Sequence, residues 1–201
     1  TESFFASVIC LYETGINAII LEKLVDPTKV ISGYYKKAEY VTNAAKNGVV
    51  SPIADSIYPY TMRHKNMKII KKALLIVTPV VAAGCAVFAV LADPICRLWL
   101  GDEIGPEVVA PLRALLPVVV ITVPNYLLGF PALSPLGLEK QANKSINYGT
   151  LFHIAGIGLL YFTGSLTLIS LCVLTCFTEL VVLCYRIIVI IRYRKAVHGN
   201  Q

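Results

Sequence analysis

The stretch ALLIVTPVVAAGCAVFAVLA at residues 73–92 decides the fold, because it is long, apolar and free of charged residues. About 20 apolar residues in a helix cross the ~30 Å hydrocarbon core of a bilayer. A second uncharged stretch follows at residues 114–133. Both are too long and continuous for barrel strands, and a helix satisfies its own backbone hydrogen bonds in lipid. The two stretches therefore predict membrane-spanning helices.

The composition of the whole chain agrees with this interpretation. Hydrophobic residues make up 56% of the 201 residues and charged residues only 15%, whereas soluble domains carry about 25% charged residues. One soluble core of this size would not bury so much apolar surface. The net charge of +6 is collected in short clusters between apolar runs, so it indicates membrane topology rather than a nucleic-acid partner.

Working outward from these stretches, the sequence predicts an all-α, polytopic helical membrane protein with a single transmembrane domain over residues 1–201. Six spans are expected, at about residues 4–21, 38–60, 70–92, 110–134, 144–163 and 166–191. The second span departs most from an apolar run, because it contains Lys46, Pro52 and Asp55.

The distribution of Lys and Arg predicts the orientation. More than half of the 18 cationic residues lie in the segments that follow the second, fourth and sixth spans. These segments alternate so as to share one side of the membrane, and cytoplasmic loops carry the excess of Lys and Arg. Both ends of this chain are therefore expected to be cytoplasmic.

Several classes of chemistry have no sequence signal. Five of the six cysteines fall inside apolar stretches, where Cys acts as a small lipophilic residue. Cys172 and Cys176 share a helix face, but no His or second Cys pair completes a zinc site. Phosphate-binding loops, dinucleotide fingerprints and hydrolase motifs are absent. The sequence thus predicts no metal, no cofactor and no enzymatic activity.

Polar residues form stripes on the first two predicted spans. In the first span the stripe consists of Ser3, Ser7, Cys10, Glu13, Thr14 and Asn17, and in the second of Tyr40, Asn43, Lys46, Asn47, Ser51, Asp55 and Tyr58. Such faces avoid lipid and contact protein or water. Packing between helices is one explanation. A shared hydrated cavity is the other. The charged residues of the stripes favour the cavity, because each charge costs about 2.5–3.5 kcal/mol at mid-membrane and packing alone rarely needs several of them.

The later spans carry further polar and helix-breaking residues. Pro117, Pro124 and Pro131 recur every seven residues, which fits either a functional hinge or ordinary tolerance of Pro in membrane helices. Glu179 and Arg186 share one face of the last span. Arg186 is expected to snorkel to the cytoplasmic surface, whereas Glu179 needs a partner or a proton.

His153 lies among three glycines of the fifth span, Gly149, Gly156 and Gly158. Small residues let the backbones of membrane helices approach each other. The pattern therefore predicts a close helix contact there, with His153 as a hydrogen-bonded polar group.

Several short segments, in their order along the chain, resemble the C-terminal half of bacterial polysaccharide flippases, or O-antigen translocases, of the multidrug and oligosaccharidyl-lipid exporter superfamily. The matching segments are Asn17-Ala18-Ile19-Ile20-Leu21, then Gly33, Tyr35 and Ala38, then Ile57-Tyr58-Pro59, the loop at residues 92–101 and Leu112-Arg113-Ala114-Leu115. The resemblance extends over about residues 4–194.

The resemblance implies a fold and a substrate. This chain would be a six-helix lobe, the C-terminal one, of a transporter of twelve or more helices in two lobes, located in the bacterial inner membrane. It would flip polyprenyl-diphosphate-linked oligosaccharides for O-antigen or capsule assembly, alongside other polysaccharide-assembly proteins. The expected substrate-binding residues are Lys46 for the diphosphate and Asn17, Asn43, Asn47, Ser51 and Tyr58 for sugar hydroxyls.

Coupling to H⁺ or Na⁺ is assigned by the same resemblance to Glu13, Asp55 and Glu179. Many relatives carry an acid where this chain has Asn17, and Glu13 lies one turn earlier on the same face. Two alternatives stay open. One is an ion-coupled multidrug or small-cation exporter of the same superfamily, and the other is a membrane-embedded polysaccharide polymerase, although the predicted outer loops are short for an enzyme site.

Overall fold

The computed structural model describes residues 15–198, and this part of the chain is helical with no strand. The elements are α2 (Ile16–Ile20), η1 (Leu21–Val25), α3 (Val30–Ala45), η2 (Lys46–Val50), α4 (Ser51–His64), α5 (Met67–Val90), α6 (Ala92–Leu100), α7 (Gly105–Leu128), α8 (Phe130–Leu133), η3 (Ser134–Leu136), α9 (Glu139–Phe162) and α10 (Leu168–His198). The prediction of an all-helical protein is confirmed for these residues.

Three of the described helical segments are long and apolar enough to cross a membrane: Met67–Val90, Gly105–Leu136 and Leu168–Ala196. They match the third, fourth and sixth predicted spans and fit a multi-pass helical membrane protein. The fifth predicted span corresponds to α9, whose 24 residues give a length of about 36 Å but include many polar side chains. Most of the first predicted span, including Glu13, lies outside the described residues.

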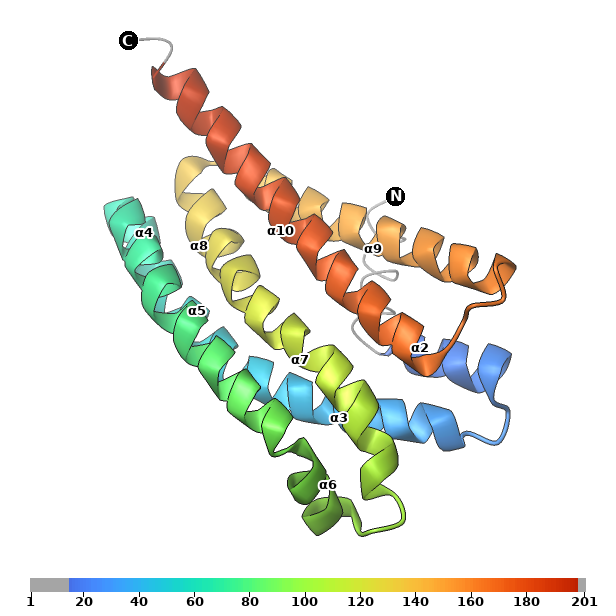
Figure 1. The fold of residues 1–201 in the computed structure, drawn as a ribbon. Helices are drawn as coiled ribbons and strands as arrows, with labels where there is room; N and C mark the ends of the chain where they lie inside the picture. The colour runs from blue at the N-terminus through green and yellow to red at the C-terminus, as the bar shows by residue number, and fades with distance from the viewer. Residues whose placement is uncertain (1–14, 199–201) are drawn as a thin grey trace.

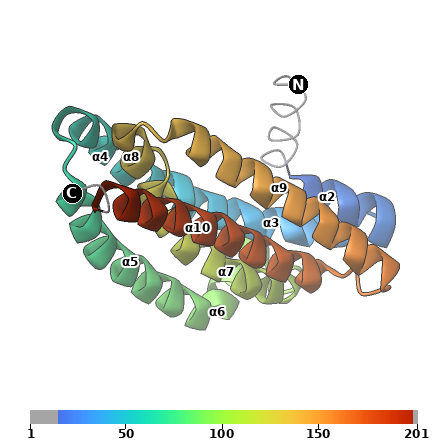
Figure 2. The same ribbon diagram turned by 90° about the horizontal axis from the view of Figure 1, so that it is seen from above.

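Helix α7 lies at the centre of the bundle and packs against α3, α5 and α10, while α10 also packs against α9. Figures 1 and 2 show α5 at one edge of the bundle and α9 at the opposite side. Leu75 and Val80 of α5 are 77% and 66% exposed. Exposed apolar side chains on a spanning helix are explained by contact with lipid.

The core consists of two clusters along α7. One joins α7 to α2, α3, α6 and α10, and includes Leu21, Tyr35 and Leu112. The other joins it to α4, α5, α8 and α10, and includes Ile70 and Leu127. Because α7 contributes to both clusters, it fixes the positions of the helices on either side of it.

Helices α3 and α4 form one continuous helix through η2, which is a π-helical turn. The N–H of Ser51 donates to the carbonyl of Lys46, five residues earlier. Pro52 follows directly, and a Pro has no N–H for the carbonyl four residues before it and crowds that carbonyl with its ring. Gly48 is the residue whose carbonyl lies four residues before Pro52, and the wider π-helical turn leaves room for both. A sequence pattern with a regular 3.6-residue period does not reveal such a turn. Turns of this kind are frequent at functional sites.

The turn that precedes α3 is held by Asp26. Its carboxylate accepts hydrogen bonds from the hydroxyl of Thr28 at 2.5 Å, from the N–H of Thr28 at 2.9 Å and from the N–H of Ile31 at 3.1 Å. These bonds lower the pKa of Asp26, and the bond from the Thr28 hydroxyl contributes most. The stability that they contribute is present above the pKa of the unfolded chain and is lost as the pH falls through the lowered value.

The predicted close contact of the fifth span is made between α9 and α10. A Cβ atom built on Gly149 would lie 2.5 Å from Cγ2 of Val182, and one built on Gly156 would meet the side chain of Leu174. A Cβ at Gly158 would meet nothing within 4 Å. Two of the three glycines thus allow α10 to approach α9, and the third faces open space.

Gly149→Ala is expected to destabilise the protein by about 1–3 kcal/mol, the usual cost of overpacking, because the branched side chain of Val182 has few rotamers in a helix. The measurement is thermal unfolding in detergent. Gly158→Ala is the matched control on the same helix, and it should be neutral or slightly stabilising because Ala favours helix. Equal melting temperatures for the two variants would contradict this packing.

Candidate functional site

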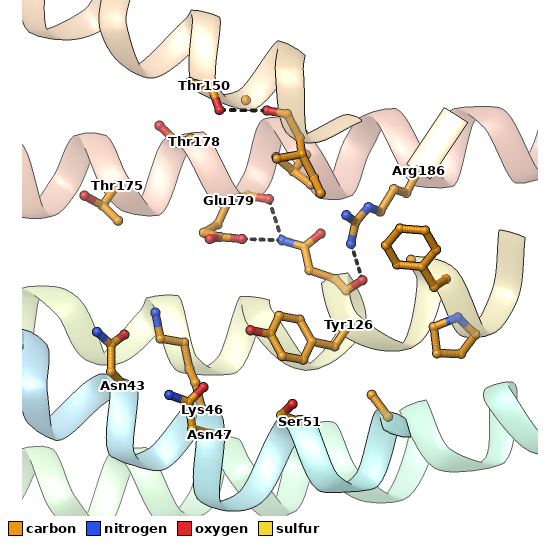
Figure 3. A pocket seen from close by; sticks show the side chains of 18 of the residues that line it. Asn43, Lys46, Asn47, Ser51, Tyr126, Thr150, Thr175, Thr178, Glu179 and Arg186 are labelled. Atoms are coloured by element: carbon orange, nitrogen blue, oxygen red, sulfur yellow. Dashed lines mark hydrogen bonds between the residues drawn. The ribbon is translucent and has the colours of Figure 1, made fainter. Parts of the chain in front are cut away.

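A cavity of about 780 Å³ lies between the α3–η2–α4 helix on one side and α7, α8, α9 and α10 on the other. Figure 3 shows polar side chains from these walls pointing into it. The predicted site residues that line it are Asn17, Asn43, Lys46, Asn47, Ser51, Asp55, Tyr58 and Glu179. Among the predicted site residues, Glu13 alone lies outside the described part of the chain. The polar stripe of the second span therefore faces a cavity, as expected.

Lys46 opens the π-helical turn η2, which brings the consecutive residues Lys46 and Asn47 to the same cavity. Figure 3 shows the amino group of Lys46 directed across the cavity toward α10, which carries Glu179. Lys46 is half-buried and interacts electrostatically with Glu179 and Glu39. Among the described residues, no carboxylate lies within 4.0 Å of its Nζ. A cation near acids but without a direct ion pair is free to contact an anionic group.

Asn125 of α7 connects the two charged residues of α10. Its amide nitrogen donates to the Glu179 carboxylate at 2.6 Å and to the Glu179 carbonyl at 3.0 Å. Its own backbone carbonyl accepts from the guanidinium of Arg186, which also donates to Oγ of Ser145 at 2.9 Å. Glu179 thus has a hydrogen-bonding partner. Asn125 Oδ1 is buried and has no partner among the described residues.

The expectation for Arg186 was wrong, because it does not snorkel to the membrane surface. The residue is 6% exposed and lines one end of the cavity. The spanning helix breaks at Gly129, where a Cβ would lie 2.9 Å from Nη1 of Arg186. The missing side chain leaves room for the guanidinium there. Pro117 and Pro124 remain inside α7, so the helix ends at Gly129 and not at these prolines.

Asn17 is held at the other end of the cavity by bonds to three helices. Its amide nitrogen donates to Oη of Tyr35 at 2.9 Å and to Oγ1 of Thr175 at 3.0 Å. Its amide oxygen lies 2.8 Å from Nε2 of His153, whose Nδ1 lies 2.9 Å from Oγ1 of Thr178. Because both N–H groups of Asn17 are used, its oxygen needs a donor, which places a proton on Nε2 of His153. His153 is a hydrogen-bonded polar group, as predicted, and the structure adds that it orients Asn17.

Sequence reasoning missed some of the lining residues and misplaced one. Tyr35, Glu39, Asn125, Tyr126 and Arg186 also line the cavity. Glu39 and Tyr35 lie one and two turns before Asn43, so extending the polar stripe toward the N-terminus would have found them. Tyr40 was assigned to the stripe, but it is 67% exposed and stacks on Trp99 with 6.3 Å between the ring centroids.

The cavity combines charges of both signs with neutral hydrogen-bonding groups. Glu39, Asp55 and Glu179 contribute carboxylates, and Lys46 and Arg186 contribute cations. Within residues 15–198 no group of three His, Cys, Asp or Glu side chains is placed to hold a metal ion. Such a lining is suited to binding a polar, charged molecule in water at membrane depth.

Comparison with known proteins finds no match to this chain among family models, curated proteins or solved structures. The functional assignment therefore rests on the cavity and on the residues that line it.

Proposed function

We propose that this chain is a lobe of a membrane transporter that moves polyprenyl-diphosphate-linked oligosaccharides across the bacterial cytoplasmic membrane for surface polysaccharide assembly. In this proposal the lobe has six spans and pairs with a second lobe, and both ends of the chain are cytoplasmic. The observation that carries the proposal is the polar cavity between membrane helices, with Lys46 on its wall.

The proposed substrate matches the lining in two respects. A diphosphate has negatively charged oxygens, and Lys is a common partner of phosphate groups. Lys46 has no ion pair within the described residues, and it is therefore assigned to the diphosphate. Sugars present hydroxyls, which amide and hydroxyl side chains bind by hydrogen bonds. The residues assigned to the sugars are Asn17, Asn43, Asn47, Ser51 and Tyr58.

Coupling to H⁺ or Na⁺ is assigned to Glu179 and Asp55, together with Glu13. An ionisable group inside a membrane protein usually marks a substrate or ion pathway. Glu179 lies opposite Lys46 and is hydrogen-bonded to Asn125, next to the unpartnered oxygen of that amide. Asp55 accepts a hydrogen bond from Ser51 at 3.2 Å. Both carboxylates are thus close to groups assigned to the substrate.

A second candidate is export of drugs or small cations. It is favoured by the excess of carboxylates over cations on the described cavity wall, where Glu39, Asp55 and Glu179 face Lys46 and Arg186. In this case the acids would bind a cationic substrate, and Lys46 would repel it.

Transport by purified protein in vesicles distinguishes the two candidates. Vesicles containing a polyprenyl-diphosphate-linked oligosaccharide are treated from outside with a glycosidase, and the cleaved fraction is measured. If the first proposal holds, the protein allows more than half of the lipid to be cleaved, whereas empty vesicles stop near half. A parallel assay with a cationic dye should show no efflux. Dye efflux without movement of the sugar lipid would replace the first proposal by the second.

A further inference from the structure

Helix α6 joins two helices that are long and apolar enough to span the membrane. Leu91 alone separates it from the end of α5, and Gly101, with φ of 83°, starts the turn into α7. Figure 1 shows α6 at the end of the bundle where α5 and α7 meet it. This helix therefore lies where the chain leaves the membrane and returns to it.

The residues of α6 fall into three sectors around the helix axis, at 3.6 residues per turn. Ala92, Cys96 and Leu100 form the first sector, and Asp93 and Arg97 form the second. The third sector contains Pro94, Ile95, Leu98 and Trp99. A helix packed on a protein in water needs only an apolar and a polar sector, so the third sector requires another explanation.

The first sector fixes α6 on the bundle. Ala92 and Cys96 are 0% and 1% exposed and belong to the core cluster around α7. A Cβ atom on Gly105 would lie 2.9 Å from backbone atoms of Arg97, so the start of α7 directly touches the backbone of α6. The contact with backbone holds α6 in one orientation about its axis.

The second sector carries ionic contacts that suit water. Arg97 pairs with Asp93 at 3.0 Å and with Asp102, in the turn after α6, at 3.6 Å. All three side chains are substantially exposed, Asp102 by 87%. This side of the helix therefore points away from the hydrocarbon core.

The third sector is apolar and uncovered. Leu98 is 91% exposed and Trp99 is 49% exposed, and Trp99 stacks on the exposed ring of Tyr40 from α3. Trp and Tyr are enriched at membrane–water interfaces, where their apolar rings and polar atoms meet different surroundings. The residues just before α6 are apolar and exposed as well: Val90, the last residue of α5, by 76% and Leu91 by 46%.

We propose that α6 is an interfacial anchor, with Leu98 and Trp99 inserted at the boundary between lipid headgroups and acyl chains and the Asp93–Arg97 pair facing water. Amphipathic helices of this kind bury their apolar face about 5–10 Å into that boundary. The anchor sets the depth of α5 and α7 in the membrane. It does not depend on what the cavity transports.

Trp99 provides the test, because it is the single Trp of the 201-residue chain. The protein is reconstituted in vesicles that contain phospholipids brominated either near the headgroup or near the end of the acyl chain, and Trp fluorescence is measured. Shallow bromines should quench Trp99 about twofold more than deep ones, as expected for an interfacial side chain. Stronger quenching by deep bromines would overturn the interfacial position.

Two variants in a Trp99→Phe background test the sector assignment. Leu98→Trp moves the reporter within the apolar sector and should keep the preference for shallow bromines. Asp102→Trp moves it to the exposed turn and should be quenched by aqueous iodide at least about twofold more than Trp99, because charged and turn residues at this end face water. If iodide quenches Trp99 as strongly as the Asp102→Trp reporter, the sector lies in water and the proposal fails.

Discussion

Lys46→Ala is expected to reduce transport of the lipid-linked oligosaccharide by about tenfold or more while leaving the amount of protein unchanged. A hydrogen bond to a charged group contributes about 1.5–3 kcal/mol, and about 1.4 kcal/mol corresponds to a tenfold change in binding. Lys46 is half-buried on the cavity wall and has no ion pair among the described residues, so its loss leaves no direct partner behind. The measurement is surface-glycan display in cells that depend on this protein, with its level followed by immunoblot.

Two further variants separate charge from shape. Lys46→Arg keeps the cation and should retain part of the transport. Lys36→Ala removes an exposed cation from the same helix, outside the cavity, and should transport normally. If cells with the Lys46→Ala variant displayed as much glycan as cells with the Lys36→Ala variant, Lys46 would have no role in binding the diphosphate.

Arg186→Ala is expected to lower the stability of the folded protein. Removing a donor so that buried acceptors are left without a partner costs about 1–3 kcal/mol, and more where the bond involves a charged group. Arg186 is 6% exposed, donates to Ser145 and to the carbonyl of Asn125, and interacts electrostatically with Glu179. We expect a large loss of the membrane-inserted protein and a lower melting temperature in detergent.

Arg192→Ala is the matched control, since it removes an exposed cation from the same helix. A double variant, Arg186→Met with Glu179→Gln, removes both charges and should recover part of the lost stability. If Arg186→Ala melted at the same temperature as Arg192→Ala, the network around Asn125 would not be structural.

Much of the fold and of the cavity wall was accessible from the sequence, because apolar length and helical periodicity are local properties. The stretch at residues 73–92 predicted α5, and the spacing of Asn43, Lys46 and Asn47 predicted a shared polar face. These patterns require only that a helix forms and that polar groups avoid lipid.

Other features depended on contacts between distant parts of the chain. The position of Arg186 follows from the helix break at Gly129 and from Ser145 on α9, neither of which is near it in sequence. Proximity to one end of an apolar stretch therefore gave the wrong expectation of snorkelling. Likewise, Tyr40 appeared to continue a polar stripe, but its ring contacts Trp99, which lies far along the chain.

The π-helical turn at Lys46–Val50 makes the α3–α4 helix sensitive to its length in residues. Deleting one residue from this turn would restore the regular helical repeat and turn everything after it by about 100° relative to everything before it. Ser51 and Tyr58 would then leave the side of the helix that carries Asn43. The number of residues in this turn therefore works as a fixed spacer between the two halves of the cavity wall, so a homologue is expected to exchange residues within it more readily than to gain or lose one.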